Sequence, residues 1–128
     1  MPPVALIVDD NPGNLAALAA LLRREAVTSV TLTSPHDIAA TLDRIGRVDV
    51  LFLDLAFPNL DGLDLIRDLQ VDERLHGVPI VAYTVHTSEQ NEARDAGFHS
   101  FLGKPLNVER FPDQLRRILS GQPVWEVE

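Results

Sequence analysis

The stretch Val4-Ala5-Leu6-Ile7-Val8-Asp9-Asp10 decides the fold. Its first five residues are apolar at odd and even positions alike. That pattern is typical of a strand buried on both faces of a parallel sheet. Val50-Leu51-Phe52-Leu53 repeats the arrangement and is followed by Asp54. The two stretches together predict an α/β protein in which carboxylates follow buried strands.

Three further apolar runs complete the predicted sheet. Val78-Pro79-Ile80-Val81-Ala82 is apolar on both parities, so we expect a third buried strand there. The run from Val27 to Thr33 alternates apolar and polar residues, which indicates an exposed edge strand. Phe98 to Leu102 is a weaker fifth candidate.

Helical patterns separate these strands. Asn11 and Ser34 each precede a proline and an apolar stripe, so both are predicted N-caps. A third helix is expected after the turn Asn59-Leu60-Asp61-Gly62. The stripes comprise Leu15, Leu18 and Leu22; Ile38, Leu42 and Ile45; Leu65, Ile66 and Leu69; and Phe111, Leu115, Ile118 and Leu119.

The fourth and fifth helices have less regular starts. Thr87-Ser88-Glu89-Gln90 fits a capping box for a helix to about Ala96, with Gly97 as its stop. Asn107 is a candidate cap for the last helix, but Pro112 would then clash with the carbonyl of Val108. We therefore expect a distorted first turn or a later start.

The order of elements is strand then helix, five times. Right-handed crossovers then predict a five-stranded parallel sheet of order 2-1-3-4-5 with helices on both faces, a flavodoxin-like three-layer sandwich. Residues 1–128 fit one domain, with a core over about 4–120. We expect residues 121–128 to be a loosely held tail outside the repeat, with Trp125 covering the protein's own surface.

Composition excludes several classes of function. The chain has 128 residues and a formal charge of −8, which argues against binding nucleic acid or an anionic membrane. It has no cysteine, which excludes disulfides and thiolate zinc sites. The four histidines lack metal-ligand spacing, so surface or cap roles are expected. No apolar run approaches the roughly 18 residues of a membrane span, and we expect a cytoplasmic protein.

Polar residues at the predicted strand ends form the candidate site. In open α/β sheets, ligands bind beyond the carboxyl ends of the strands, where the strand order reverses. The residues expected there are Asp9, Asp10, Asp54, Thr84 and Lys104. Two carboxylates about 4 Å apart repel by roughly 4 kcal/mol at an effective dielectric constant near 20. A divalent cation with a preference for oxygen ligands, Mg²⁺ or Mn²⁺, would offset that repulsion.

These motifs together resemble the receiver domain of two-component response regulators. The resemblance covers about residues 4–120 and includes Leu6-Ile7-Val8-Asp9-Asp10-Asn11, Leu53-Asp54, Pro58, Asp61-Gly62, Thr84 and Lys104-Pro105. It implies a stand-alone regulator of a two-component or phosphorelay pathway. Such a protein is not an enzyme in the usual sense, but a phosphoacceptor that catalyses its own phosphorylation and dephosphorylation.

The resemblance assigns a role to each site residue. Asp54 would be the phosphoacceptor, phosphorylated from a phosphohistidine donor. Asp10, Asp54 and the backbone carbonyl of Ala56 would bind Mg²⁺ directly, and Asp9 would bind it through water. Lys104 and Thr84 would contact phosphoryl oxygens. A cis peptide bond before Pro105 is also expected in this family.

The resemblance also implies a switch. Thr84 would turn toward the phosphoryl group and Phe101 would rotate inward, changing the surface of helix 4, strand 5 and helix 5. Residues expected on that surface are Arg94, His99, Arg110 and Phe111. Val85 is larger than the residue usual there and should narrow access to Asp54, while His86 would contact the phosphoryl group or water. Because access to Asp54 is narrowed, we expect its phosphoryl group to be hydrolysed slowly.

Expected partners are a histidine kinase or a histidine phosphotransfer protein upstream and a protein target downstream, with a homodimer through helices 4 and 5 left open.

Three other hypotheses about the function remain. A flavin-binding electron carrier would need a hydroxyl-rich phosphate loop where Asp9-Asp10 stands. An aspartyl-phosphate phosphatase or phosphotransferase would need a second acid at Ala56. A degenerate receiver would act as an unphosphorylated scaffold.

Overall fold

A parallel sheet forms the centre of the computed structural model, which describes residues 2–57 and 60–126. The strands follow the spatial order β2 (Thr28–Leu32), β1 (Val4–Val8), β3 (Val50–Leu53), β6 (Ile80–Thr84), β7 (Ser100–Gly103) and β8 (Trp125–Glu126). The first five of these confirm the predicted parallel order 2-1-3-4-5. Two short strands, β4 (Ala56–Phe57) and β5 (Leu60–Asp61), pair separately and antiparallel.

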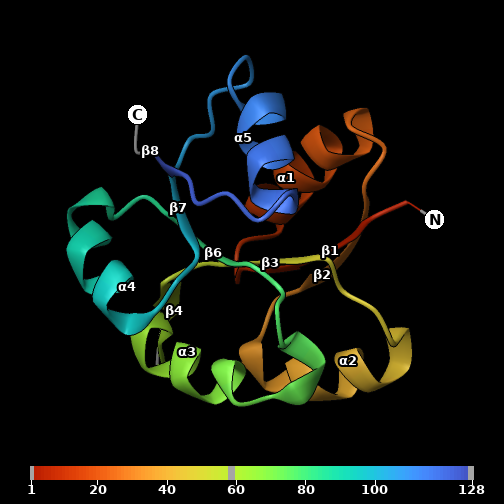
Figure 1. The fold of residues 1–128 in the computed structure, drawn as a ribbon, viewed down its shortest axis with the longest axis vertical. Helices are drawn as coiled ribbons and strands as arrows, with labels where there is room; N and C mark the ends of the chain where they lie inside the picture. Colours follow the sequence, from red (N-terminus) through yellow and green to blue (C-terminus); the bar gives the residue numbers. More distant parts are fainter. Residues whose placement is uncertain (1, 58–59, 127–128) are drawn as a thin grey trace.

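Helices cover both faces of the sheet, as predicted (Figure 1). One face carries α1 (Pro12–Arg24) and α5 (Phe111–Leu119), and the other carries α2 (Ile38–Ile45), α3 (Gly62–Gln70) and α4 (Gln90–Ala96). Alternate residues of each strand enter the two cores; Leu6 packs with the α2–α3–α4 layer and Ile7 with the α1–α5 layer. The central strands β1 and β3 are therefore buried on both sides, which explains their uninterrupted apolar sequence.

Two of the predicted N-caps are confirmed by hydrogen bonds. The Asn11 side chain accepts from the amide of Asn14 at 3.1 Å at the start of α1. Ser34 Oγ accepts from the amide of His36, but the turn it caps is the 3₁₀ segment η1 (Pro35–Asp37), which leads directly into α2. Asp61 caps α3 by accepting from the amide of Leu63 at 2.9 Å. Pro58 and Asn59, which belong to the predicted motif and turn, lie outside the described residues.

The start of α4 differs from the prediction. Thr87-Ser88-Glu89 forms a 3₁₀ turn, η3, with His86 at its N-cap, so the predicted capping box is wrong. The helix proper is only Gln90–Ala96 and ends, as predicted, at Gly97, whose φ of 105° suits glycine. A single turn of 3₁₀ helix satisfies the amides that a capping side chain would otherwise bind. A second such turn, η2 (Glu73–Leu75), lies between α3 and β6.

The last helix and the tail complete the fold. Helix α5 begins at Phe111, with Pro112 in its first turn, which confirms the later start; the Asn107 side chain instead accepts from the amides of Glu109 and Arg110. The tail was predicted to be loosely held, and this is wrong for the described part, because Trp125–Glu126 adds β8 to the outer edge of β7. Among residues 2–57 and 60–126, no helix is long and apolar enough to cross a membrane.

Candidate functional site

Three carboxylates meet at the carboxyl ends of β1 and β3. Asp9 and Asp10 follow β1, Asp54 follows β3, and one oxygen from each lies within 4.8 Å of the others. Asp9 is fully buried and Asp54 is 5% exposed, while Asp10 is exposed to solvent. The strands bring them together because β1 and β3 pair in register, Val8 opposite Leu53. The predicted convergence of Asp9, Asp10 and Asp54 is therefore confirmed.

The ammonium group of Lys104 lies between the two buried acids. Its Nζ is 2.6 Å from Asp9 Oδ2 and 3.3 Å from Asp54 Oδ2. Lys104 follows β7, and its Nζ atom lies over the ring of Tyr83, 4.4 Å from the ring centroid. The peptide bond between Lys104 and Pro105 is cis, as expected. Lys104, Asp9 and Asp54 thus form one buried charge cluster at the ends of three strands, with the exposed Asp10 beside it.

Burial sets the electrostatics of this cluster. The pKa of Asp54 is raised, chiefly because burial disfavours the charged carboxylate, and the neighbouring Asp9 charge adds to the effect. The amide of Ala56, which donates to Asp54 Oδ1 at 3.2 Å, and the ammonium of Lys104 act in the opposite direction. Burial and the same two carboxylates raise the pKa of Tyr83 to about 12. Burial therefore outweighs the ammonium and the amide in setting the pKa of Asp54.

Thr84 lies at the end of β6, fully buried, where its Oγ1 accepts from the amide of His86 at 3.0 Å. Its backbone carbonyl accepts from the amide of Lys104 at 2.9 Å, which joins the two predicted phosphoryl-binding residues. The Val85 side chain is 61% exposed, and His86 is exposed next to it. Thr84 and Lys104 therefore lie on adjacent strand ends, as their order in the sequence predicts.

Gly62 packs next to the site, although the sequence analysis gave it no role beyond its place in the turn and in the Asp61-Gly62 motif. A Cβ atom at this position would lie 2.8 Å from Leu55 Cα and 3.1 Å from the backbone carbonyl of Asp54. The first turn of α3 therefore packs directly on the backbone that follows Asp54. The signal that could have identified it was its place in the Asp61-Gly62 motif, next to a helix cap.

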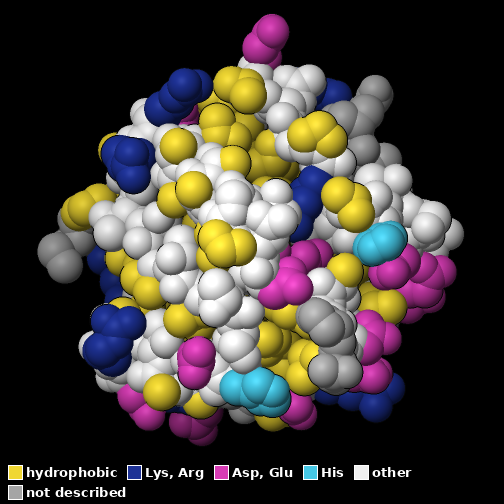
Figure 2. Space-filling model, turned by 180° about the vertical axis from the view of Figure 1, so that it is seen from behind, with side chains coloured by type: hydrophobic (Ala, Val, Ile, Leu, Met, Phe, Trp, Pro, Cys, Tyr) yellow, Lys and Arg dark blue, Asp and Glu magenta, His cyan; other side chains and the backbone are white. Residues whose placement is uncertain are grey.

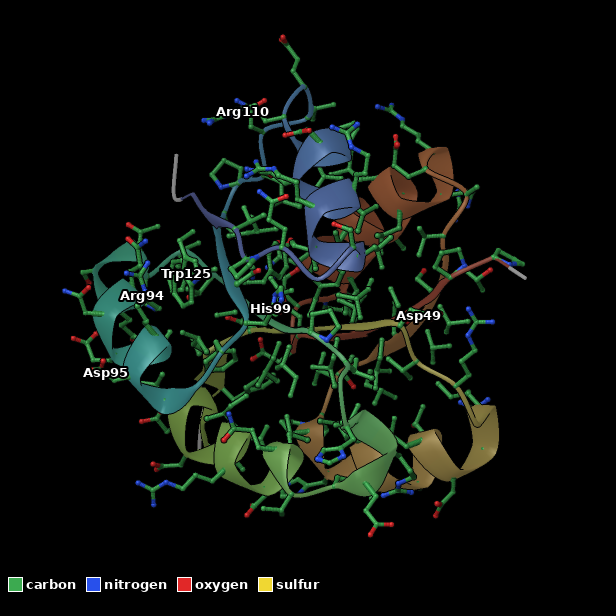
Figure 3. The ribbon with its side chains drawn as sticks, in the orientation of Figure 1. Asp49, Arg94, Asp95, His99, Arg110 and Trp125 are labelled. Atoms are coloured by element: carbon green, nitrogen blue, oxygen red, sulfur yellow. The ribbon has the colours of Figure 1, made fainter. Side chains whose placement is uncertain are left out.

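The predicted output residues do not form one exposed surface. Phe111 is fully buried in the α1–α5 core, so its assignment to the output surface is wrong. Phe101 is also fully buried, and its ring stacks on Trp125 with 5.9 Å between the centroids. Figure 3 shows Arg94 next to Trp125, with Arg110 at the far end of α5. Trp125 therefore covers the protein's own surface, as predicted, and does so on β7 and α4.

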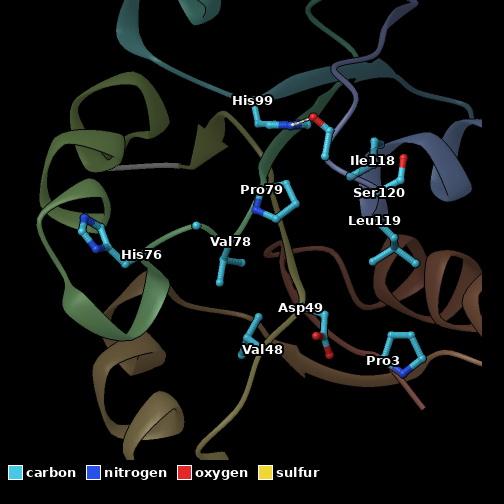
Figure 4. A pocket seen from close by; sticks show the side chains of 12 residues that line it. Pro3, Val48, Asp49, His76, Val78, Pro79, His99, Ile118, Leu119 and Ser120 are labelled. Carbon is cyan, nitrogen blue, oxygen red and sulfur yellow. Dashed lines mark hydrogen bonds between the residues drawn. The ribbon is translucent and has the colours of Figure 1, made fainter. Parts of the chain in front are cut away.

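His99 belongs to a pocket at the opposite edge of the sheet (Figure 4). The pocket has a volume of about 580 Å³, and its lining includes Asp49, His76 and Pro79, which lie in the segments that lead into β3 and β6. His99 Nε2 bonds the carbonyl of Gly121 at 3.2 Å, and the Nδ1 atom bonds Ser100 Oγ at 2.9 Å.

Seen from behind, the molecule presents acidic and basic side chains together near the centre of its face (Figure 2). His36, His76 and His86 are exposed, in line with the surface roles predicted for them.

The donor set at the acidic cluster fits a hard divalent cation. Three carboxylate oxygens within 4.8 Å of one another are ligands that Mg²⁺ and Mn²⁺ prefer, and the exposed Asp10 leaves room for water ligands. Ala56 is exposed beside Asp54, so its predicted role as a carbonyl ligand is sterically open and stays a prediction.

The fold and the site define a doubly wound α/β protein with an acid–lysine cluster at its topological switch point. The family model for the response regulator receiver domain matches residues 5–116. This chain belongs to that family.

Comparison with individual proteins agrees. The polar-differentiation response regulator DivK of Brucella anthropi is 26% identical over 121 residues, which are 93% of this chain and 98% of that protein. The fold matches the chemotaxis response regulator CheY4 of Vibrio cholerae, with a TM-score of 0.80, 22% identity and coverage of 92% and 99%. It also matches the receiver domain of a Pseudomonas aeruginosa sensor histidine kinase, with a TM-score of 0.81, 25% identity and coverage of 94% and 99%. That domain carries a magnesium ion in its active site cleft.

Proposed function

We propose that the protein is a response regulator whose Asp54 accepts a phosphoryl group from the phosphohistidine of a histidine kinase or a histidine phosphotransfer protein. The observation that carries the proposal is the position of Lys104 Nζ, 2.6 Å from Asp9 and 3.3 Å from Asp54. Burying an ammonium and two carboxylates costs desolvation free energy, and charge clusters of this kind are concentrated at functional sites. A phosphoryl group on Asp54 would give the ammonium a further anionic partner.

The proposed reaction transfers one phosphoryl group between two side chains. The nitrogen–phosphorus bond of the donor breaks as a carboxylate oxygen of Asp54 forms a bond to phosphorus. The electron pair of the broken bond returns to the imidazole nitrogen. Such a transfer needs in-line positioning and compensation of charge more than covalent chemistry from the protein. Water would then hydrolyse the acyl phosphate, which returns Asp54 to its carboxylate and releases inorganic phosphate, as expected of a phosphoacceptor that promotes its own phosphorylation and dephosphorylation.

A divalent cation belongs to this proposal. Asp10, Asp54 and the carbonyl of Ala56 would hold Mg²⁺ or Mn²⁺ directly and Asp9 through water, and the cation, when bound, neutralises charge on the phosphoryl oxygens. Support comes from the three clustered carboxylates and from the related Pseudomonas aeruginosa domain, whose active site cleft holds magnesium. Lys104 would pair with one phosphoryl oxygen, and Thr84 would donate its hydroxyl hydrogen to another.

The output of the phosphorylated protein would be a change of its α4–β7–α5 surface that a protein target recognises. The net charge of −8 favours a protein target over nucleic acid. Thr84 is the last residue of β6, and β6 pairs with β7, where Phe101 is fully buried. A movement of Thr84 can therefore reach β7 through side chains that are in contact. Two-component or phosphorelay signalling is the proposed setting.

Intact-mass measurement tests the proposal. The purified protein is incubated with acetyl phosphate and Mg²⁺, and we expect the mass to rise by one phosphoryl group. The gain should be absent in Asp54→Asn and without Mg²⁺, and present in Asp61→Asn, which changes an exposed acid nearby. Absence of the gain in the wild-type protein, with Mg²⁺ binding confirmed by calorimetry, would overturn the proposal and favour a degenerate receiver.

A further inference from the structure

Tyr83 lies on β6 directly before Thr84, and the face of its aromatic ring meets the ammonium group of Lys104. Lys104 Nζ lies 4.4 Å from the centroid of this ring. We propose that Tyr83 is a positioning residue, whose ring holds the ammonium of Lys104 at Asp54 and thereby sets the rate at which Asp54 accepts a phosphoryl group. The effect on the rate rests on the proposed function, whereas the placement of the ammonium concerns the unphosphorylated protein alone.

Two consecutive residues of β6 hold Lys104 at its two ends. The backbone carbonyl of Thr84 accepts from the amide of Lys104 at 2.9 Å, which fixes the main chain. The ring of Tyr83 contacts the ammonium at the other end of the side chain. A flexible aliphatic stem separates these two ends, and ordering such a stem costs conformational entropy. The attraction between the ring and the cation offsets part of that cost.

The contact with the ring differs in kind from the contacts with the acids. Nζ is 2.6 Å from Asp9 Oδ2 and 3.3 Å from Asp54 Oδ2, and both attractions depend on the charges of these groups. Burial and the charges of the two acids raise the pKa of Tyr83 to about 12, so the ring is uncharged at neutral pH. An uncharged ring attracts a cation through its quadrupole. Tyr83 therefore holds the ammonium before and after Asp54 changes its charge.

A cleft beside the ring offers the ammonium another position. The cleft has a volume of about 400 Å³ and lies between α1 and the segment that follows β7. Tyr83 and Lys104 both line it, together with Asn14 and Leu106. Tyr83 is only 4% exposed and packs in the core that α1 and α5 cover (Figure 1). A shorter aliphatic side chain at position 83 would join the cleft to the acid cluster, and Lys104 could then turn away from Asp54 toward solvent.

Nuclear magnetic resonance tests the placement of the ammonium. Lys104 is the only lysine of the chain and Tyr83 is its only tyrosine, so protein labelled with carbon-13 lysine gives one set of lysine signals. The ring current should shift the ε protons of Lys104 upfield of those of free lysine in the wild-type protein and in Tyr83→Phe. This shift should be lost in Tyr83→Leu. Wild-type ε protons at the position of free lysine would overturn the proposal, even if Tyr83→Leu does not fold.

Phosphorylation by acetyl phosphate tests the effect on the reaction, with intact mass as the readout. We expect the rate to fall about fivefold in Tyr83→Leu, which corresponds to about 1 kcal/mol, the size of a cation–π contact. Tyr83→Phe keeps the ring and should retain the wild-type rate. The matched control is Phe111→Leu, which shortens another buried aromatic side chain of the same core and should leave the rate unchanged.

Three kinetic results would overturn the proposed role of the ring. Equal rates in the wild-type protein and Tyr83→Leu would show that the contact has no effect. Equal losses in Tyr83→Leu and Phe111→Leu would indicate a general effect of truncating the core, and equal losses in Tyr83→Phe and Tyr83→Leu would assign the effect to the hydroxyl group. If the wild-type protein accepts no phosphoryl group, the proposed function fails together with the effect on its rate, and the lysine signals still decide whether the ring holds the ammonium.

Discussion

Lys104 Nζ lies 2.6 Å from Asp9 Oδ2, although 95 positions separate the two residues in the chain. Both side chains are almost completely buried, at 7% and 0% exposure, and Asp54 lies on the other side of the ammonium. This ion pair joins the ends of β1 and β7 around the phosphoacceptor candidate. It makes the stability of the fold and the chemistry of the site depend on the same charge.

Replacing Lys104 by methionine should therefore destabilise the protein strongly. Lys104→Met keeps the length of the side chain and removes the charge, which leaves two buried carboxylates without their cation. We expect the free energy of unfolding to fall by about 3 kcal/mol in urea denaturation at neutral pH without Mg²⁺. Added Mg²⁺ should recover part of the loss, because the ion binds only the folded state. A loss unaffected by Mg²⁺ would argue against a cation site at these carboxylates.

Replacing Asp54 by asparagine should have the opposite effect on stability. Burial raises the pKa of Asp54, so the charged form is a cost to the folded protein. With EDTA present, we expect Asp54→Asn to be about 1 kcal/mol more stable than the wild-type protein at neutral pH, as is common where function opposes stability. The amide keeps the shape of the carboxylate, and Lys104 keeps Asp9 as its partner.

The same substitution gives a pH dependence of known sign. Because the pKa of Asp54 is higher in the folded than in the unfolded protein, the folded state retains this proton over a window that starts at the ordinary value of 3.8. Below that window Asp54 is protonated in both the folded and the unfolded protein, so its burial does not lower the free energy of unfolding through a buried charge. As pH rises through the folded pKa, the wild-type protein loses stability relative to Asp54→Asn. Thermal melts of both proteins from pH 3.5 to 7.5 should show a gap that widens with pH; a gap that narrows would contradict the raised pKa.

Gly62→Ala should disturb the site through the backbone. The new Cβ would lie 2.8 Å from Leu55 Cα, which is main chain and cannot rotate away. We expect a loss of about 2 kcal/mol in free energy of unfolding and slower phosphorylation by acetyl phosphate. The matched control is Gly13→Ala, in the first turn of α1, where the Cβ would meet only the Asn11 side chain at 3.1 Å. Equal losses in the two variants would exclude a specific role for the Gly62 contact.

Val85→Ala tests the expectation of slow hydrolysis. Val85 follows Thr84 and its side chain is 61% exposed, so truncation removes bulk near the site with little cost to the core. We expect the phosphorylated protein to lose its phosphoryl group roughly threefold faster, a change of about 0.7 kcal/mol in activation free energy. The decay is followed by intact mass after removal of acetyl phosphate. Val71→Ala, 81% exposed on α3's C-terminal side, is the control and should leave the rate unchanged.

The sequence alone determined the sheet and the members of the site. A strand buried on both faces must be apolar at every position, so β1 and β3 were visible from their composition. Residues at the carboxyl ends of neighbouring parallel strands must meet, so Asp9, Asp10 and Asp54 were assigned to one edge. Both inferences depend on local pattern and on a general rule of topology.

Only the tertiary structure decided how the C-terminal segment pairs and which side chains of the last helices are buried. A two-residue strand has no period to detect, so β8 emerged only from its hydrogen bonds to β7. Thr87–Glu89 forms a 3₁₀ turn in place of the predicted capping box, because backbone carbonyls accept hydrogen bonds from the amides that a capping side chain would otherwise bind. Phe111, at the start of α5, proved fully buried because α5 packs against α1 and the sheet. Main-chain pairing and packing depend on contacts between segments far apart in the chain, which residue patterns along one segment do not encode.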